Sequence, residues 1–168
     1  MYEIGAKIVY GSTGVCTITD ITDGSNVGGE AGRTYYVIEP LGGGCMIYTP
    51  VDSKVYMRPV VNKDEADKLI ESIPDIKSEA YFAKSVQQLG SHYDEVIKTH
   101  DCESLIKLLM SIHEKKRYVL ERKQKFGQLD ERFMKKAEEL LYSEFSVALG
   151  IPKDKVEEYI HDKVEAMR

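Results

Sequence analysis

Two short β-rich runs around a glycine-bounded turn constrain the fold of this chain more than any other feature. The runs are residues 6–10 and 15–21, and the turn between them is Gly11-Ser12-Thr13-Gly14. Its two glycines are able to adopt the positive φ that a tight reversal needs. In the second run, Cys16, Ile18 and the aliphatic part of Asp20 alternate onto one face. This period of two predicts a β-hairpin with one face in a small interior.

Three more strand-like segments follow, at residues 34–40, 45–49 and 55–60. They are bounded by glycine and proline turns, as short antiparallel strands usually are. Residues 23–33 form a Gly-rich polar loop that we expect to be mobile. Five short strands in sixty residues predict a small SH3-like or Tudor-like antiparallel β-barrel for residues 1–60.

The hydrophobic period becomes helical after Val61. Asn62 and Glu65 form a capping-box pattern, which predicts a short helix that ends at Pro74. Further helices are expected over residues 78–97, 105–126, 130–149 and 152–164, with Ser78 and Asp130 as N-caps, Gly127 and Gly150 as stops, and Pro152 in the first turn of the last helix. The chain is therefore predicted to be an α+β protein, with a β domain at 1–60 and an all-helical bundle at 61–168.

Basic residues gather in one stretch, although the chain has a formal net charge of −5. From Lys107 to Lys136, ten Lys or Arg stand against four acidic residues, while both flanking segments are acidic. A solvated helix face explains such charges in many proteins, because long basic side chains cover apolar surface. Contact with nucleic acid phosphates is the functional interpretation. The candidate DNA-binding residues are Lys115, Lys116, Arg117, Arg122, Lys123 and Lys125.

Several other classes of function lack sequence support. No apolar run approaches the ~18 residues of a membrane span, and the N-terminus does not resemble a signal peptide. The three cysteines and four histidines lack metal-ligand spacing, and no Gly-rich segment leads into Lys-Ser or Lys-Thr at a helix start. We expect a cytoplasmic monomer with free thiols, no catalytic residues, no metal site and no cofactor, and not an enzyme.

A family resemblance rests on residues 4–10 (Ile-Gly-Ala-Lys-Ile-Val-Tyr) and 15–21 (Val-Cys-Thr-Ile-Thr-Asp-Ile). They resemble the opening of the CarD family of bacterial transcription regulators and the RNA-polymerase-interacting domain of transcription-repair coupling factors. Members usually carry Pro and His where this chain has Gly11 and Thr13. The helical half is similar to the CarD helical domain at residues 108–112 and 131–141.

This resemblance implies two partners. The β domain would bind the RNA polymerase β-subunit through an exposed strand edge, which implies contacts from Met46, Tyr48, Thr49 and Pro50. The helical domain would bind promoter DNA, largely independently of sequence, at the upstream edge of the transcription bubble. Family members place a Trp there as a wedge, and this chain has no Trp. The candidate wedge residues are Tyr81, Phe82 and Tyr93.

The expected function is thus that of a nucleoid-associated transcription regulator that alters open-complex stability. The alternative is a protein-interaction module that binds polymerase or another partner and makes no DNA contact. The acidic total charge and the missing Trp favour this alternative, whereas the basic stretch favours the regulator.

Overall fold

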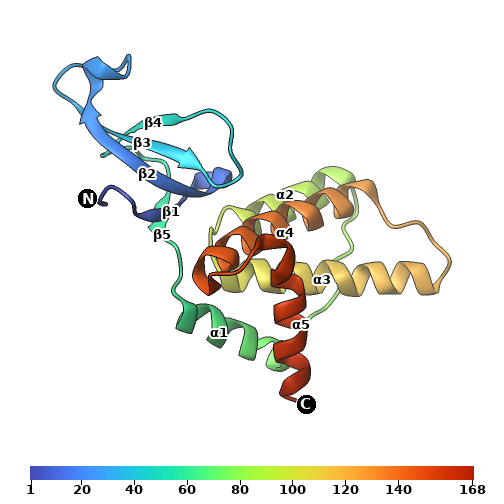
Figure 1. Cartoon of the computed structure of the whole chain (residues 1–168). Coiled ribbons are helices and arrows are strands. Elements are labelled where there is room, and N and C mark those ends of the chain that lie inside the picture. Colours follow the sequence, from blue (N-terminus) through green and yellow to red (C-terminus); the bar gives the residue numbers. More distant parts are fainter. The chain divides into compact units, whose positions relative to one another are not determined.

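The computed structural model describes all 168 residues, which form two compact units, Met1–Val60 and Val61–Arg168 (Figure 1). The first unit is an antiparallel five-stranded sheet and the second contains five α-helices. The predicted α+β class, with strands before helices, is confirmed. No helix has both the length and the apolar character needed to cross a membrane.

The sheet of the first unit has the strand order β4-β3-β2-β1-β5, so β4 and β5 are its edges. The Tyr10 hydroxyl on β1 donates to Thr49 Oγ1 on β4 at 3.3 Å. Two strands lie between β1 and β4 in the sheet order, so this bond shows that the sheet curls around its own interior. The bounds are β1 Lys7–Tyr10, β2 Gly14–Asp23, β3 Thr34–Pro40, β4 Ile47–Pro50 and β5 Met57–Pro59.

A bulge in β2 changes which side chains reach this interior. The pairing of β2 with β3 shifts between Ile18 and Asp20, so Thr19 is an extra residue in β2. The predicted placement of Asp20 on the inner face is therefore wrong, because the bulge inverts the alternation beyond it. Ile21 packs on the core in its place. The buried core consists of Ile8, Cys16, Ile18, Tyr36 and Ile38.

The loop at residues 23–33 contains a set of internal hydrogen bonds centred on Asp23. The Asp23 carboxylate accepts hydrogen bonds from Ser25 N–H, Ser25 Oγ and Gly32 N–H at 2.6–2.9 Å. Gly24 packs so closely that a Cβ there would lie 2.0 Å from the Glu30 carbonyl oxygen. The polar composition predicts a loop without an apolar core, and hydrogen bonds to the Asp23 side chain hold the loop together instead.

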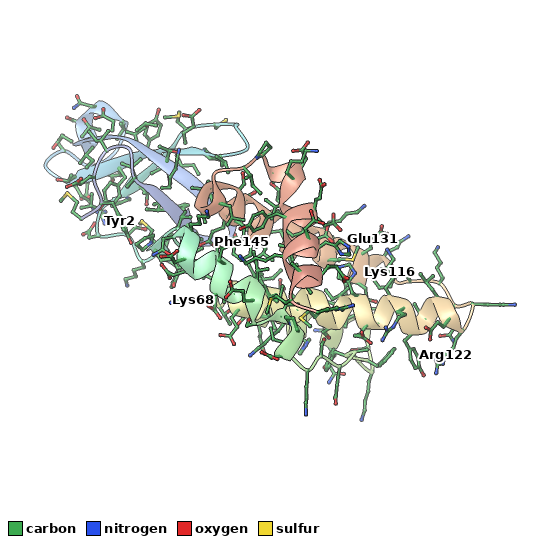
Figure 2. The ribbon with its side chains drawn as sticks, turned by 60° about the horizontal axis from the view of Figure 1, so that its bottom comes forward. Tyr2, Lys68, Lys116, Arg122, Glu131 and Phe145 are labelled. Carbon is green, nitrogen blue, oxygen red and sulfur yellow. The ribbon has the colours of Figure 1, made fainter.

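The helices of the second unit are α1 Lys63–Glu71, α2 Val86–Ile97, α3 Cys102–Glu121, α4 Gln128–Leu149 and α5 Val156–Ala166. Their core is built around Tyr93, Ile112 and Phe145, all almost fully buried (Phe145 is labelled in Figure 2). The predicted capping box of α1 is confirmed, because Asn62 Oδ1 accepts from Glu65 N–H and Glu65 Oε1 accepts from Asn62 N–H.

Several predicted helix ends differ. Ser85 caps α2 and Ser78 caps nothing, so residues 76–85 include no helix. Gly127 is the N-cap of α4 and not the stop of the preceding helix, since α3 ends at Glu121. Asp130 lies inside the first turn of α4, where a neighbouring helix supplies its partner. A 3-10 turn, Lys153–Lys155, separates Pro152 from α5.

Candidate functional site

The outer edge of β4 offers unpaired backbone groups at Tyr48. The N–H of Val51 donates to the carbonyl of Thr34, and the register then pairs Thr49 with Tyr36 by backbone hydrogen bonds. Because bonded positions alternate along an antiparallel strand, the N–H and C=O of Tyr48 point away from β3. The Tyr48 side chain is also 50% exposed. This edge can therefore accept a further strand.

The other predicted polymerase-binding residues differ in how accessible they are to a partner. Met46 is exposed just before β4, and Pro50 closes the strand with no N–H to donate. Thr49 is buried and accepts the Tyr10 hydroxyl, so neither its side chain nor its backbone is available to a partner. This corrects the expectation of a contact from Thr49. Successive side chains of a strand point to opposite faces, so the Thr49 side chain points inward and the Tyr48 side chain points outward.

The opposite edge of the sheet is a poorer template. The bonds Gly11 N–H to Tyr56 O and Val60 N–H to Lys7 O leave the backbone of Met57 and Pro59 pointing outward. Proline has no N–H, so only one donor remains on this three-residue strand. The β4 edge is the better candidate for strand addition.

A second candidate surface lies where α3 ends and the chain turns into α4. We call it the basic tip and define it as Arg117, Arg122, Lys123 and Lys125, all exposed. Figures 1 and 2 show the last turns of α3 extending beyond the neighbouring helices, with Arg122 near the end. Arg117 pairs with Glu114 at 2.6 Å, whereas Arg122, Lys123 and Lys125 form no ion pair. These three charges are available to an anionic partner.

Lys115 is not part of this surface, which corrects its prediction as a DNA contact. Its side chain is buried, and its ammonium lies 2.9 Å from Asp130 Oδ1. The same oxygen accepts the hydroxyl of Tyr93 at 2.5 Å. Lys116 is half-buried, with its ammonium 5.5 Å from the centre of the Phe126 ring.

The three candidate wedge residues have different environments. Tyr93 is 1% exposed, so it cannot reach a ligand. Burial together with the bond to Asp130 raises its pKa above the ordinary value. Tyr81 is half-buried and stacks on His92 at 3.7 Å between ring centres. Phe82 is 53% exposed and meets the Tyr118 ring edge-on at 5.1 Å. Of the three, only Phe82 has its ring on the surface next to α3.

Comparison with protein families adds one finding. A sequence model described as the CarD-like/TRCF RID domain matches residues 2–61. The N-terminal unit is a CarD-like/TRCF RID domain. The matched range, which is about a third of the chain, agrees within one residue at each end with the β-sheet unit, Met1–Val60. No curated protein sequence matches the chain.

The RID domain family is described as RNA-polymerase-interacting, which supports a transcription-related, polymerase-binding role. Tyr48 and Met46 stand at the exposed edge of the RID domain, in the part of the sequence that the family covers. The helical unit, with the basic tip and Phe82, lies outside the matched residues.

Sequence reasoning missed the second ring beside Phe82. Tyr118 belongs to one stripe of α3, with Ser111, Lys115 and Arg122, at the helical spacing i, i+4, i+7 and i+11. This stripe faces residues 76–85: Ser111 Oγ donates to the Glu79 carbonyl at 2.7 Å, and the Lys115 ammonium lies 5.3 Å from the Phe82 ring centre. The helical spacing of this stripe is the sequence signal from which the position of Tyr118 could have been predicted.

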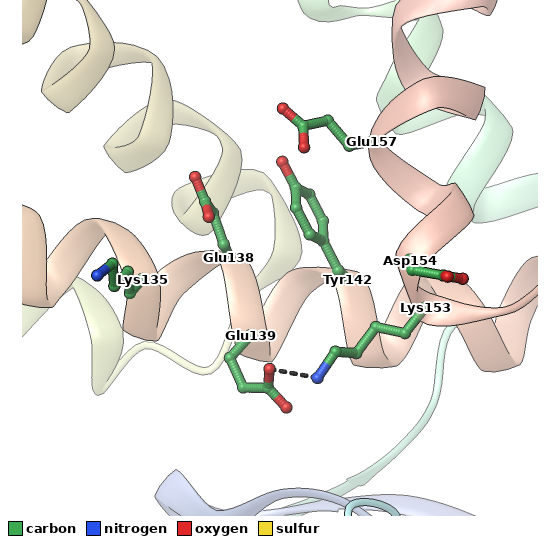
Figure 3. A pocket seen from close by; sticks show the side chains of 7 residues that line it. All are labelled: Lys135, Glu138, Glu139, Tyr142, Lys153, Asp154 and Glu157. Carbon is green, nitrogen blue, oxygen red and sulfur yellow. Dashed lines mark hydrogen bonds and ion pairs between the residues drawn. The ribbon is translucent and has the colours of Figure 1, made fainter.

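A pocket of about 360 Å³ between α4 and α5 has the opposite electrostatic character (Figure 3). Four of its seven lining residues are acidic, and Glu139 pairs with Lys153. Burial raises the pKa of Glu138 and raises that of Tyr142 to about 12. Such a lining disfavours phosphates. No group of three or more His, Cys, Asp or Glu is arranged to hold a metal ion.

Proposed function

We propose that this protein regulates transcription by linking RNA polymerase to promoter DNA. The RID domain would bind the polymerase β-subunit, and the helical domain would contact DNA near the upstream edge of the bubble. The outcome would be a change in open-complex stability in the cytoplasm, without covalent chemistry. The free β4 edge on a RID domain is the observation that carries this proposal.

Strand addition is the proposed mode of polymerase binding. A partner strand would bond to the N–H and C=O of Tyr48, while the Tyr48 and Met46 side chains supply apolar contact. The C=O of Pro50 already accepts from Ser53 N–H, so the added ladder would be short. A short ladder has few backbone hydrogen bonds, so we expect a modest affinity.

The basic tip is the proposed DNA contact. Its three unpaired cations would bind phosphates without sequence preference, and Phe82 beside them would insert at a base step in place of the family's Trp. Two weak linked contacts raise each other's effective concentration, so stable binding would occur only on a polymerase–promoter complex.

Capture of a purified polymerase β-lobe fragment by the full chain tests the first contact. Tyr48→Asp places a charge at the strand edge and should abolish capture. Thr13→Asp, in the exposed turn between β1 and β2, adds the same charge away from that edge and should leave capture unchanged. Equal capture by the Tyr48→Asp variant and the wild type would remove support for the β4 edge.

Charge reversal tests the second contact. A triple variant, Arg122→Glu, Lys123→Glu and Lys125→Glu, should weaken promoter binding and lower the salt slope by about one per lost phosphate contact. Lys68→Glu, on the exposed face of α1, is a single charge reversal away from the basic tip and should leave promoter binding nearly unchanged (Figure 2). Polymerase capture should persist in both variants.

The alternative function, an interaction module without DNA contact, draws support from the net charge of −5 and the acidic pocket. It predicts that the triple variant leaves promoter occupancy and open-complex lifetime unchanged while Tyr48→Asp abolishes capture. The two experiments together therefore separate a polymerase-bound DNA contact from simple polymerase binding.

A further inference from the structure

A small pocket lies between α2 and α3, in a part of the helical unit that neither proposed contact uses. Its volume is about 230 Å³. Two residues of α2 and four of α3 line it: His92, Val96, Ser104, Lys107, Leu108 and Ser111. Sites for drug-sized ligands have about 300–1,000 Å³, so this pocket admits only a small ligand.

The apolar part of the lining belongs to the helical core. Leu108 is 4% exposed, and Val96 is half-buried and packs against the core residues. These two side chains keep their places whether or not the pocket is filled, because the surrounding helices hold them. They offer a fixed contact for a short carbon chain.

The charged part of the lining is positive, since Lys107 is the one lining residue with a permanent charge and no acidic side chain lines the pocket. The Lys107 ammonium lies 3.2 Å from Glu103 Oε1, and both side chains are more than half exposed. Such surface pairs at i, i+4 are weak, so an anion in the pocket can compete with Glu103 for the ammonium. An anionic group is therefore the favoured partner of Lys107.

The His92 ring is held in place without using its nitrogens. It stacks on the Tyr81 ring, with 3.7 Å between the ring centres, and forms no hydrogen bond within the chain. One nitrogen of a neutral imidazole carries a hydrogen that it can donate. His92 thus adds a second donor for an anion.

The two serines offer acceptors to a ligand. The Ser104 hydroxyl donates to Asp101 Oδ2 at 3.0 Å, and the Ser111 hydroxyl donates to the Glu79 carbonyl at 2.7 Å. A hydroxyl has one hydrogen and two lone pairs, so each serine oxygen can still accept a bond. A ligand that complements this pocket carries a donor group as well as a negative charge.

We propose that this pocket binds a small organic anion that also bears a hydroxyl or amino group. Its carboxylate or phosphate would pair with Lys107 and accept from His92. Its carbon chain would contact Val96 and Leu108, and its hydroxyl or amino group would donate to a serine oxygen. The site is distinct from the basic tip, because Lys107 precedes Arg122 by fifteen residues, about 22 Å along the axis of α3.

NMR titration of the ¹⁵N-labelled full chain tests this site with two probes, 3-hydroxybutyrate and glycerol 3-phosphate. At least one should shift the amide signals of α2 and α3, with a Kd on the order of 1 mM for so small a ligand. The probe that binds more tightly shows whether a carboxylate or a phosphate is preferred. The neutral analogues 1,3-butanediol and glycerol should cause no shift. Absence of shifts with both anions at about ten times that concentration would overturn the site.

Two variants assign the contacts. Lys107→Met should weaken binding by about tenfold or more, because it removes a charge-assisted bond. Lys68→Met removes another exposed lysine, away from the pocket, and should leave the affinity unchanged. His92→Phe keeps a ring that can stack on Tyr81 and removes the donor, so it should also weaken binding. An unchanged affinity in Lys107→Met, or an equal loss in Lys68→Met, would overturn the site.

The triple variant of the basic tip separates this pocket from the nearest cluster of unpaired cations. Arg122→Glu, Lys123→Glu and Lys125→Glu together should leave the affinity for the anion unchanged, since none of the three lines the pocket. Loss of binding in that variant would place the anion on the basic tip and overturn the pocket. Neither polymerase nor DNA is present in these titrations, so their outcome is independent of the proposed function.

Discussion

The ammonium of Lys115 and the carboxylate of Asp130 form a buried ion pair, 2.9 Å apart, that joins α3 to α4. Tyr93 on α2 donates to the same carboxylate oxygen, so one buried charge pair fixes three helices. Removing the lysine alone would leave a carboxylate without its countercharge in the interior, which costs far more than the pair itself contributes.

Lys115→Met should therefore destabilise the protein by about 3–5 kcal/mol, measured by urea denaturation. The double variant Lys115→Met with Asp130→Asn should recover most of this loss, because the amide is neutral and its oxygen still accepts from Tyr93. A double variant as unstable as the single one would show that packing, and not the stranded charge, is the cause.

Lys123 adopts a left-handed backbone, with φ 56°, in the turn that ends α3. Its N–H bonds to Leu120 O and that of Gln124 to Val119 O, the pattern of a Schellman motif whose left-handed position favours glycine. Lys123→Gly should thus raise the free energy of unfolding by about 1 kcal/mol. Lys123→Ala is the control, since it removes the charge and keeps the strain, and it should bring no gain.

The pKa of Asp23 lies below its ordinary 3.8, chiefly because the Ser25 side chain donates to it, with the Ser25 and Gly32 N–H groups adding to the effect. The unfolded chain then binds more protons near pH 4, so this contribution is present above that pH and lost as pH falls through the folded pKa. Stability curves of the wild type and Asp23→Asn from pH 6 to 2.5 should converge at the acid end. Parallel curves would count against this role of Asp23.

The three cysteines should differ sharply toward a thiol-exchange reagent. Cys16 and Cys102 are buried, and burial raises the pKa of Cys16 to about 11, whereas Cys45 is exposed. One thiol per chain should react quickly in the native protein and three after denaturation. Cys45→Ser should remove the fast reaction, and a persisting fast phase in that variant would mean that one of the buried cysteines opens to solvent.

Local patterns predicted the elements that depend on neighbours in sequence. The capping box of Asn62 and Glu65 and the strand at residues 34–40 are where spacing placed them. The inward turn of Lys115 was beyond such reasoning, because its partner Asp130 comes from the next helix. The same holds for Asp20, whose face depends on a bulge opposite β3.

The start of α2 shows what the sequence could not predict about the candidate site. Ser78 and Ser85 both fit an N-cap pattern, and the structure uses Ser85. Glu79, between them, accepts a hydrogen bond from Ser111 of α3 at its carbonyl, and residues 76–85 include no helix. Phe82 reaches the surface for that reason, and only knowledge of the α3 stripe would have placed it beside Tyr118.

An open sheet edge is a hazard for any protein that must remain dispersed, because copies of the chain can add to one another as readily as a true partner. Here β4 has four residues, Pro50 at one end and two left-handed glycines, Gly43 and Gly44, shortly before the other. A fibril needs long, flat, repeatable ladders. An edge of four residues can pair with one added strand, but it is too short to support the extended ladder that aggregation requires.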